Sequence, residues 1–163
     1  MQMTSYFNPG LLISVIIPEN WTASQVSENK FRLFSAPEGG LEDFFDEYRV
    51  TMSYEHIAPP YDSKDNWLPD LVSDNNIMMA RTYNEYKLIS DCFYESDNRP
   101  AYRKIYAWTD EQTGLRLFQI QAFIYGGPHS LYMVNGAVVE KLKEKYLPIL
   151  ESILASTRIA PSA

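Results

Sequence analysis

The chain contains few of the residue types that carry catalysis or bind metal ions: His56, His129 and a single cysteine, Cys92. Zinc sites use three or four ligands, usually grouped in spacings such as CxxC or HExxH, and neither spacing occurs here. Cys92 paired with a distant histidine would be a nucleophile. A cysteine inside a strand is more commonly a small buried apolar residue. We therefore predict no catalytic residues, no metal site and no cofactor.

Two other local patterns resemble ligand sites but lack the required spacing. The glycine pairs at 39–40 and 126–127 follow expected strands without forming a P-loop or a GxGxxG motif, so they predict turns. The acidic run EDFFDE at 42–47 lacks the ligand alternation and the glycine of a calcium loop. We predict a solvated loop, with Phe44 and Phe45 either clipping it to the protein or contacting a partner.

The bulk composition predicts a globular protein without nucleic-acid or membrane partners. The 163 residues are 45% hydrophobic and 14% aromatic, and they contain no apolar run of transmembrane length. The net charge of -7 would repel nucleic acid and anionic membrane surfaces. One cysteine forms no internal disulfide, and the first residues lack a basic segment followed by an apolar one. We expect a cytoplasmic location and no membrane insertion.

Apolar periodicity predicts seven strands and two helices. Alternating or β-branched runs predict strands at 11–17, 30–36, 48–56, 86–95, 101–109, 115–125 and 131–138. Apolar residues at helical spacing predict helices at 67–83 and 139–154. Asp65 or Asn66 is the expected cap of the first helix, and Pro69 is tolerated in its first turn.

The connections between the late strands, SDNR, DEQTG and GGPHS, are short and rich in turn-forming residues. Such turns favour antiparallel hairpins over crossover connections. We therefore predict an α+β fold with a single antiparallel β-sheet of about six to seven strands, flanked by two main helices. The chain is expected to form one domain, 1–163, with its core at about 11–159.

Two sequence elements carry a resemblance to a known family. The run ISVIIPENW is an apolar strand ending at Pro18 with Trp21 shortly after it, and FQIQAFIY and SLYMVNGAV lead directly into the last helix. With the order of elements, these runs resemble the PsbP/DcrB-like superfamily over about residues 11–159. Its members include photosystem extrinsic subunits, a Ran-binding import factor, bacterial lipoproteins and chaperones of type VI secretion effectors. The resemblance implies a protein-binding domain and no enzyme.

The late strands present two different sides. In LFQIQAFIY, Ile120, Ala122 and Ile124 form one side, which we expect under the last helix together with the small side chains of 101–109. The opposite side is rich in aromatic rings and amides, which suit an interaction surface. The binding residues predicted from it are Tyr102, Tyr106, Trp108, Gln119, Gln121, Phe123 and Tyr125.

Two arrangements of that aromatic side follow from the sequence. Either the 67–83 helix covers it, or a groove stays open with an exposed apolar strip beside Tyr106, Trp108 and Phe123. An open groove predicts a protein or peptide segment as partner, with a homodimer as one way to deepen it. The alternatives are a small-molecule or lipid binder, or a cryptic hydrolase, with a pocket between sheet and helix, and an accessory subunit whose acidic loop meets a basic partner.

Overall fold

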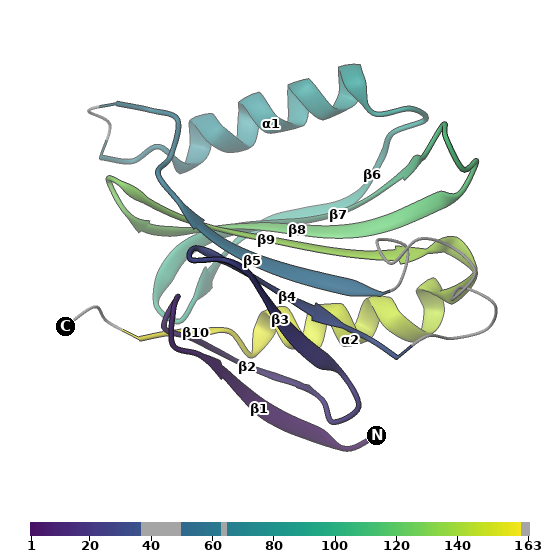
Figure 1. Cartoon of the computed structure of the whole chain (residues 1–163). Coiled ribbons are helices and arrows are strands. Elements are labelled where there is room, and N and C mark those ends of the chain that lie inside the picture. Colours follow the sequence, from purple (N-terminus) through teal and green to yellow (C-terminus); the bar gives the residue numbers. More distant parts are fainter. Residues whose placement is uncertain (37–49, 63–64, 161–163) are drawn as a thin grey trace.

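The computed structural model describes residues 1–36, 50–62 and 65–160, and its largest element is a seven-stranded antiparallel sheet (Figure 1). In order across the sheet, its strands are β3 (Thr22–Ser27), β4 (Lys30–Phe34), β5 (Thr51–Ile57), β9 (Ser130–Val139), β8 (Arg116–Gly127), β7 (Arg99–Thr109) and β6 (Lys87–Ser96). The four late strands form the predicted meander, and the predicted α+β class is confirmed.

A second, three-stranded sheet contains β1 (Met3–Asn8), β2 (Ile13–Pro18) and β10 (Arg158–Ile159). The strand expected at 11–17 therefore does not join the main sheet. Ile13, Val15 and Ile17 on one side of β2 are buried in the main core, so β2 acts as a cover for the large sheet.

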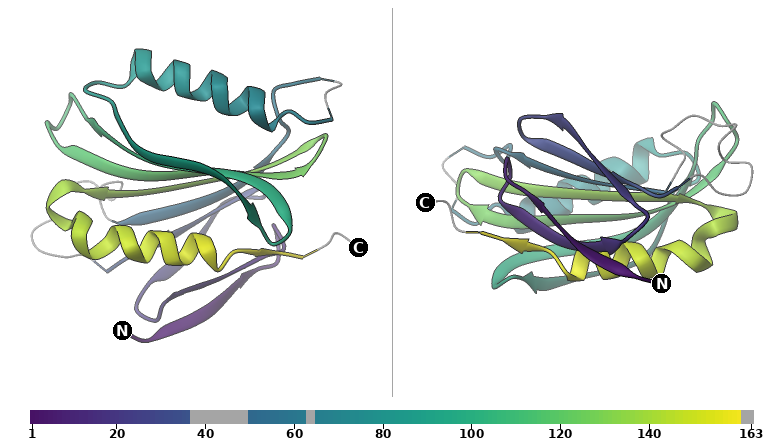
Figure 2. Two further views of the ribbon diagram at one scale, coloured as in Figure 1. Left: turned by 180° about the vertical axis from the view of Figure 1, so that it is seen from behind. Right: turned by 60° about the horizontal axis from the view of Figure 1, so that its bottom comes forward.

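Each face of the large sheet has its own cover. Helix α1 (Leu68–Thr82) lies over what we call the upper face (Figure 1). Helix α2 (Lys143–Ala155), which follows the short 3-10 helix η3 (Glu140–Leu142), lies beside the small sheet over the lower face (Figure 2). Pro69 falls in the first turn of α1 as expected, but the cap position is Trp67, whose side chain makes no capping hydrogen bond. The predicted cap by Asp65 or Asn66 is wrong.

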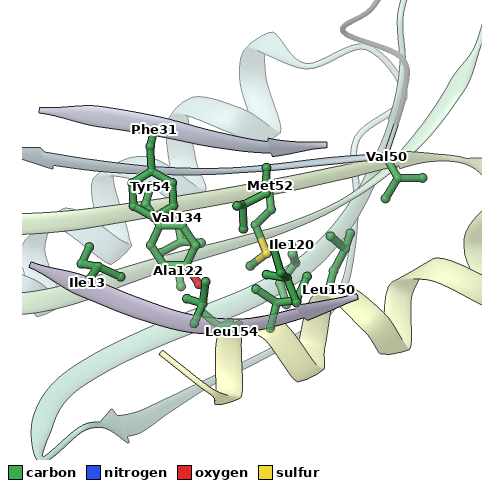
Figure 3. Packing of buried hydrophobic residues seen from close by; sticks show 14 of the residues in the cluster. Ile13, Phe31, Val50, Met52, Tyr54, Ile120, Ala122, Val134, Leu150 and Leu154 are labelled. Carbon is green, nitrogen blue, oxygen red and sulfur yellow. The ribbon is translucent and has the colours of Figure 1, made fainter. Parts of the chain in front are cut away.

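The main core lies between the lower face and α2 (Figure 3). Ile120 and Ala122 of β8 and Leu150 of α2 are each at most 1% exposed. Gly136 of β9 permits this approach, because a Cβ atom there would lie 2.9 Å from Ile120 Cγ2 and 3.3 Å from the Leu150 methyl groups. Within the described residues, no helix is both long enough and apolar enough to cross a membrane.

Candidate binding surface

The two sides of β7 and β8 differ as their alternation predicts. Ile105 lies opposite Ile120 on the lower face, whereas Tyr102 lies opposite Phe123 on the upper face. We call the upper set the ring-rich face. Its members are Tyr102, Lys104, Tyr106, Trp108, Gln119, Gln121, Phe123 and Tyr125.

Helix α1 covers the middle of the ring-rich face. Trp67 and Val72 pack in one cluster with Tyr102 and Phe123. Tyr102 and Phe123 are each 1% exposed and Tyr106 is 2% exposed. The expected exposed apolar strip is therefore wrong at Tyr106 and Phe123, because α1 packs onto Phe123 and the rings of Tyr83 and Tyr86 lie against Tyr106. The alternative in which this helix covers the face is the correct one there.

The rim of the ring-rich face is half-buried and tied to the ends of α1. Trp108 Nε1 donates a hydrogen bond to Gln119 Oε1 at 2.6 Å, and the Trp108 ring meets the edge of Tyr83 after the helix. At the other end, the Tyr125 hydroxyl donates to the Asp65 carbonyl at 2.5 Å. Contact of these side chains with a partner stays a prediction.

Gln121 lies deeper in the same face and is 8% exposed. Its Nε2 donates to Asn135 Oδ1 of β9 at 3.2 Å, while its Oε1 is buried and accepts no hydrogen bond from the described residues. A buried acceptor without a partner costs about 1–3 kcal/mol. The Gln121 amide is thus bonded to a neighbouring side chain of the sheet, and α1 supplies no donor for its oxygen.

Lys104 is fully buried between the sheet and α1, and its direct hydrogen-bond partners are neutral groups. Its Nζ donates to Asn75 Oδ1 and Asn76 Oδ1, both at 2.9 Å, and to the Tyr86 hydroxyl at 3.3 Å. The ammonium also lies 5.1 Å from the centre of the Tyr106 ring. Amide oxygens and ring faces stabilise a cation without neutralising it. Lys104 therefore fastens α1 to the sheet by charge-assisted hydrogen bonds.

Burial shifts the ionisation of this cluster. Desolvation lowers the pKa of Lys104 to about 8, and the carboxylate of Asp91 opposes part of that shift. Desolvation also raises the pKa of Tyr102 to about 12, assisted by the hydrogen bond it donates to Asp91 Oδ2 at 2.8 Å. At neutral pH the cluster contains a protonated lysine and neutral phenols.

Strand β6 is the exposed border of the ring-rich face. Within the described sheet it pairs with β7 alone, so the opposite side of its backbone is open. Leu88, Ile89 and Phe93 are 41%, 45% and 59% exposed. The Phe93 ring lies 5.1 Å from that of Tyr102, so the aromatic face continues to the surface here.

On the lower side of β6 there is a cleft of about 610 Å³, between the strand and the end of α2. Cys92 and Arg103 line it from the sheet, and Arg158 lines it from β10. The Tyr94 hydroxyl beside it is buried and makes no hydrogen bond with the described residues, and burial raises the pKa of Tyr94 to about 12. The cleft therefore has a mixed lining, in which Arg103, Arg158 and nearby carboxylates lie beside Leu154 and Ala155.

The remaining sequence candidates contribute no cluster of ligands. His56 Nε2 lies 2.6 Å from Ser130 Oγ, and its ring stacks on Tyr132, which is a structural arrangement. The described residues contain no group of three or more histidine, cysteine or acidic side chains placed to hold a metal ion. Phe44 and Phe45, predicted as a partner loop, lie outside the described residues.

The sequence reasoning missed the exposed side of β6. It predicted a strand at 86–95 but assigned no role to Leu88, Ile89 or Phe93. The available signal was the order of the meander, because its first strand has one sequential neighbour and becomes an edge unless another strand joins it.

No protein-family model matches the chain, and no curated protein matches it by sequence. Solved structures share its fold. PA94 from Pseudomonas aeruginosa matches with a TM-score of 0.64 at 17% identity, over 99% of this chain and 100% of that chain. PsbP (CyanoP) from Synechocystis matches with a TM-score of 0.66 at 12% identity, over 97% and 92%. The Saccharomyces cerevisiae Ran-binding protein Mog1p matches with a TM-score of 0.59 at 7% identity, over 98% and 96%. The fold is therefore PsbP-like.

Proposed function

We propose that this chain is a non-enzymatic binding domain that holds a segment of a partner protein along β6, at the open border of its ring-rich face. The observation that carries the proposal is the exposure of Leu88, Ile89 and Phe93 on a ten-residue strand with one described neighbour. Exposed apolar side chains on an open edge favour association with another chain.

The other edge strand of the sheet, β3, differs from β6 in ways that support β6 as the binding edge. β3 has the sequence TASQVS, and its pairing with β4 is interrupted between Gln25 and Ser27. Short length, polar side chains and irregular pairing are the usual protections of an edge strand. β6 is longer and more apolar, so it is the edge suited to a partner. Phe44 and Phe45 remain a proposed second contact.

The shared fold is consistent with a protein partner, since one solved relative is a Ran-binding protein. We extend the proposal to an accessory role in the cytoplasm. The alternative roles are those of a DcrB-like protein, a chaperone of type VI effectors or a photosystem accessory protein. The genes beside the coding sequence test these roles: an effector gene favours the chaperone, and photosynthesis genes favour the photosystem role.

Site-specific photo-crosslinking in the source cells tests the binding surface. A photoreactive benzoyl-phenylalanine replaces Phe93 in one variant and Val26 of β3, 50% exposed, in the control. We expect a discrete protein adduct from position 93 and none from position 26. Equal adduct patterns from both positions, or none from position 93, would contradict the proposal.

The cleft of about 610 Å³ favours a second candidate, a small anionic molecule held by Arg103 and Arg158. Its volume lies in the range of ligand pockets. Thermal shift assays with a panel of small carboxylates and phosphates test it. A stabilising compound should lose its effect in Arg103→Met, and a panel without any stabilising compound would remove this candidate.

A further inference from the structure

We infer that the partner segment binds as an added antiparallel β-strand on Asp91–Glu95, and that it is basic and apolar in alternation. This inference rests on the proposed function, because it specifies the occupant of the same β6 edge. It follows from three features of β6: which backbone groups point outward, which side chains flank them, and what lies below the strand.

The β6–β7 hairpin determines which backbone groups are open. Its turn residues Asp97 and Asn98 both have positive φ, 49° and 63°, as a two-residue type I′ turn requires. In such a hairpin the flanking pair, Ser96 and Arg99, exchanges both hydrogen bonds. Tyr94 and Cys92, two and four residues before Ser96, repeat that pattern and bond to β7. The residues between them alternate with this set, so the N–H and C=O groups of Asp91, Phe93 and Glu95 point away from β7.

The open stretch is short and regular. The pairing of β6 with β7 is in register from Ser90 to Ser96 and shifts between Leu88 and Ser90. That irregularity twists the strand and limits a regular added ladder. A partner strand is therefore expected to pair over about five residues centred on Phe93.

The side chains of this stretch define the chemistry of the partner. Asp91, Phe93 and Glu95 lie on the upper side, with a carboxylate on each side of an exposed ring. Opposite charges and apolar groups facing each other across strands are stabilising, and like charges are destabilising. The net charge of -7 adds a long-range attraction for a basic segment and opposes a second copy of this chain.

The lower side of β6 accepts the other side chains of the partner. Cys92 and Tyr94 alternate with the outward residues and border the cleft, whose roof is this strand and whose opposite wall contains Leu154 and Ala155 of α2. Figure 2 shows the β6–β7 hairpin bending towards the end of α2. Small apolar side chains of an added strand would therefore face this cleft.

The probe for strand addition is a fluorescent peptide that is blocked at both ends. Its core sequence is lysine-valine-isoleucine-valine-lysine. In antiparallel register its lysines face Glu95 and Asp91, its isoleucine faces Phe93, and its valines face the cleft. We expect saturable binding by fluorescence anisotropy. Exchanging both lysines for glutamates should weaken binding at least tenfold, and so should N-methylation of the isoleucine, whose amide faces β6. N-methylation of a valine, whose amide faces away, should have less than a threefold effect.

Two protein variants of equal charge change localise the site. Glu95→Lys on β6 should weaken binding at least fivefold, whereas Glu28→Lys in the β3–β4 turn should leave it within twofold. Raising the salt concentration should weaken binding to the parent protein more than to Glu95→Lys. Equal effects of the two variants would overturn the assignment to β6.

Cys92 reports the strand direction. Two peptides each carry a cysteine, activated as a pyridyl disulfide, in place of one valine. In the antiparallel arrangement the cysteine at the second valine position lies beside Cys92. In a parallel arrangement the cysteine at the first valine position would lie there instead. The Cys92 thiolate attacks the peptide sulfur and thiopyridone leaves with the electron pair. We expect at least fivefold faster trapping at the second position, and faster trapping at the first would overturn the antiparallel arrangement.

The remaining outcomes separate the two proposals. If position 93 crosslinks to a protein in cells but the probe does not bind, strand addition of a basic segment is wrong and partner binding stands. If neither occurs, both are wrong. A concentration-dependent dimer in sedimentation that Phe93→Thr abolishes would assign the edge to a second copy and overturn the basic segment.

Discussion

The two faces of the large sheet are built on the same strands but are covered in different ways. The lower face is held by burial of aliphatic and aromatic side chains, in a cluster that includes twenty-three of the described residues. The upper face has a cluster of six buried apolar residues and depends in addition on hydrogen bonds from Lys104, Trp67 and Tyr125. The difference indicates that α2 is part of the core, whereas α1 is a cover fixed by directional contacts.

Matched leucine truncations on the two helices should give the largest difference. Leu150 of α2 is 0% exposed and Leu68 of α1 is 3% exposed. Leu150→Ala should lower the free energy of unfolding by about 2–5 kcal/mol, because it leaves a cavity in the closely packed lower core. Leu68→Ala should cost at least about 1 kcal/mol less, since it lies at the helix end in the smaller cluster. Urea denaturation measures both, and equal losses would contradict the comparison.

The two-sided strands could be predicted because side chains alternate along a strand and short turns fix antiparallel pairing. The alternation at 101–109 and 115–125 therefore predicted which residues lie under α2. The strands β1, β3 and β10 were missed. β3 has mainly polar side chains and none of its residues is buried, and β10 has only two residues, so both depend on neighbours distant in sequence.

The candidate site was harder to predict than the fold. The apolar stripe of 67–83 predicted a helix, but the sequence left open whether this helix covers the aromatic face or leaves a groove. Lys104 on a strand looks exposed in sequence, and its partners Asn75 and Asn76 are more than 25 residues away on α1. The position of β6 at the edge of the sheet depends on the order of all seven strands. Tertiary arrangement, rather than local pattern, decides these features.

A second prediction probes the close approach on the lower face. Gly136→Ala should destabilise the protein by about 1–3 kcal/mol, because the added Cβ would lie 2.9 Å from Ile120 Cγ2 and Leu150 would have to shift as well. In a Leu150→Ala background the same change should cost less, because the truncation removes the methyl groups at 3.3 Å. Additive losses in thermal or urea unfolding would show that the helix does not press on β9 here.

A third prediction concerns the pH dependence of the upper face. The folded pKa of Lys104, about 8, lies below its unfolded value of 10.5. Between these values the unfolded chain binds more protons than the folded one, so stability rises with pH. Relative to Lys104→Met, the parent protein should gain about 1–2 kcal/mol from pH 8 to pH 9.5. The window ends there because unfolded tyrosines ionise near pH 10.

The control for that measurement is Lys87→Met, which removes an exposed lysine from β6. Its pH profile should follow the parent protein. At neutral pH, Lys104→Met should cost less than the loss of its hydrogen bonds to Asn75 and Asn76 alone, because it also removes the cost of burying a charge and keeps the apolar volume. A Lys104→Met variant that keeps the parent's rise in stability from pH 8 to pH 9.5 would show that Lys104 does not cause that rise.

The smallest effect should come from Trp67, the N-cap residue of α1. Trp67 Nε1 donates to the Gly127 carbonyl at 2.9 Å, and Trp67→Phe removes that bond while keeping an aromatic ring in the site. The expected loss is about 1 kcal/mol. Because α1 is a cover, the loss should appear as faster amide exchange in α1, with α2 unchanged. Exchange that accelerates equally in both helices would mean that α1 opens only when the whole domain unfolds, and the distinction between cover and core would then fail.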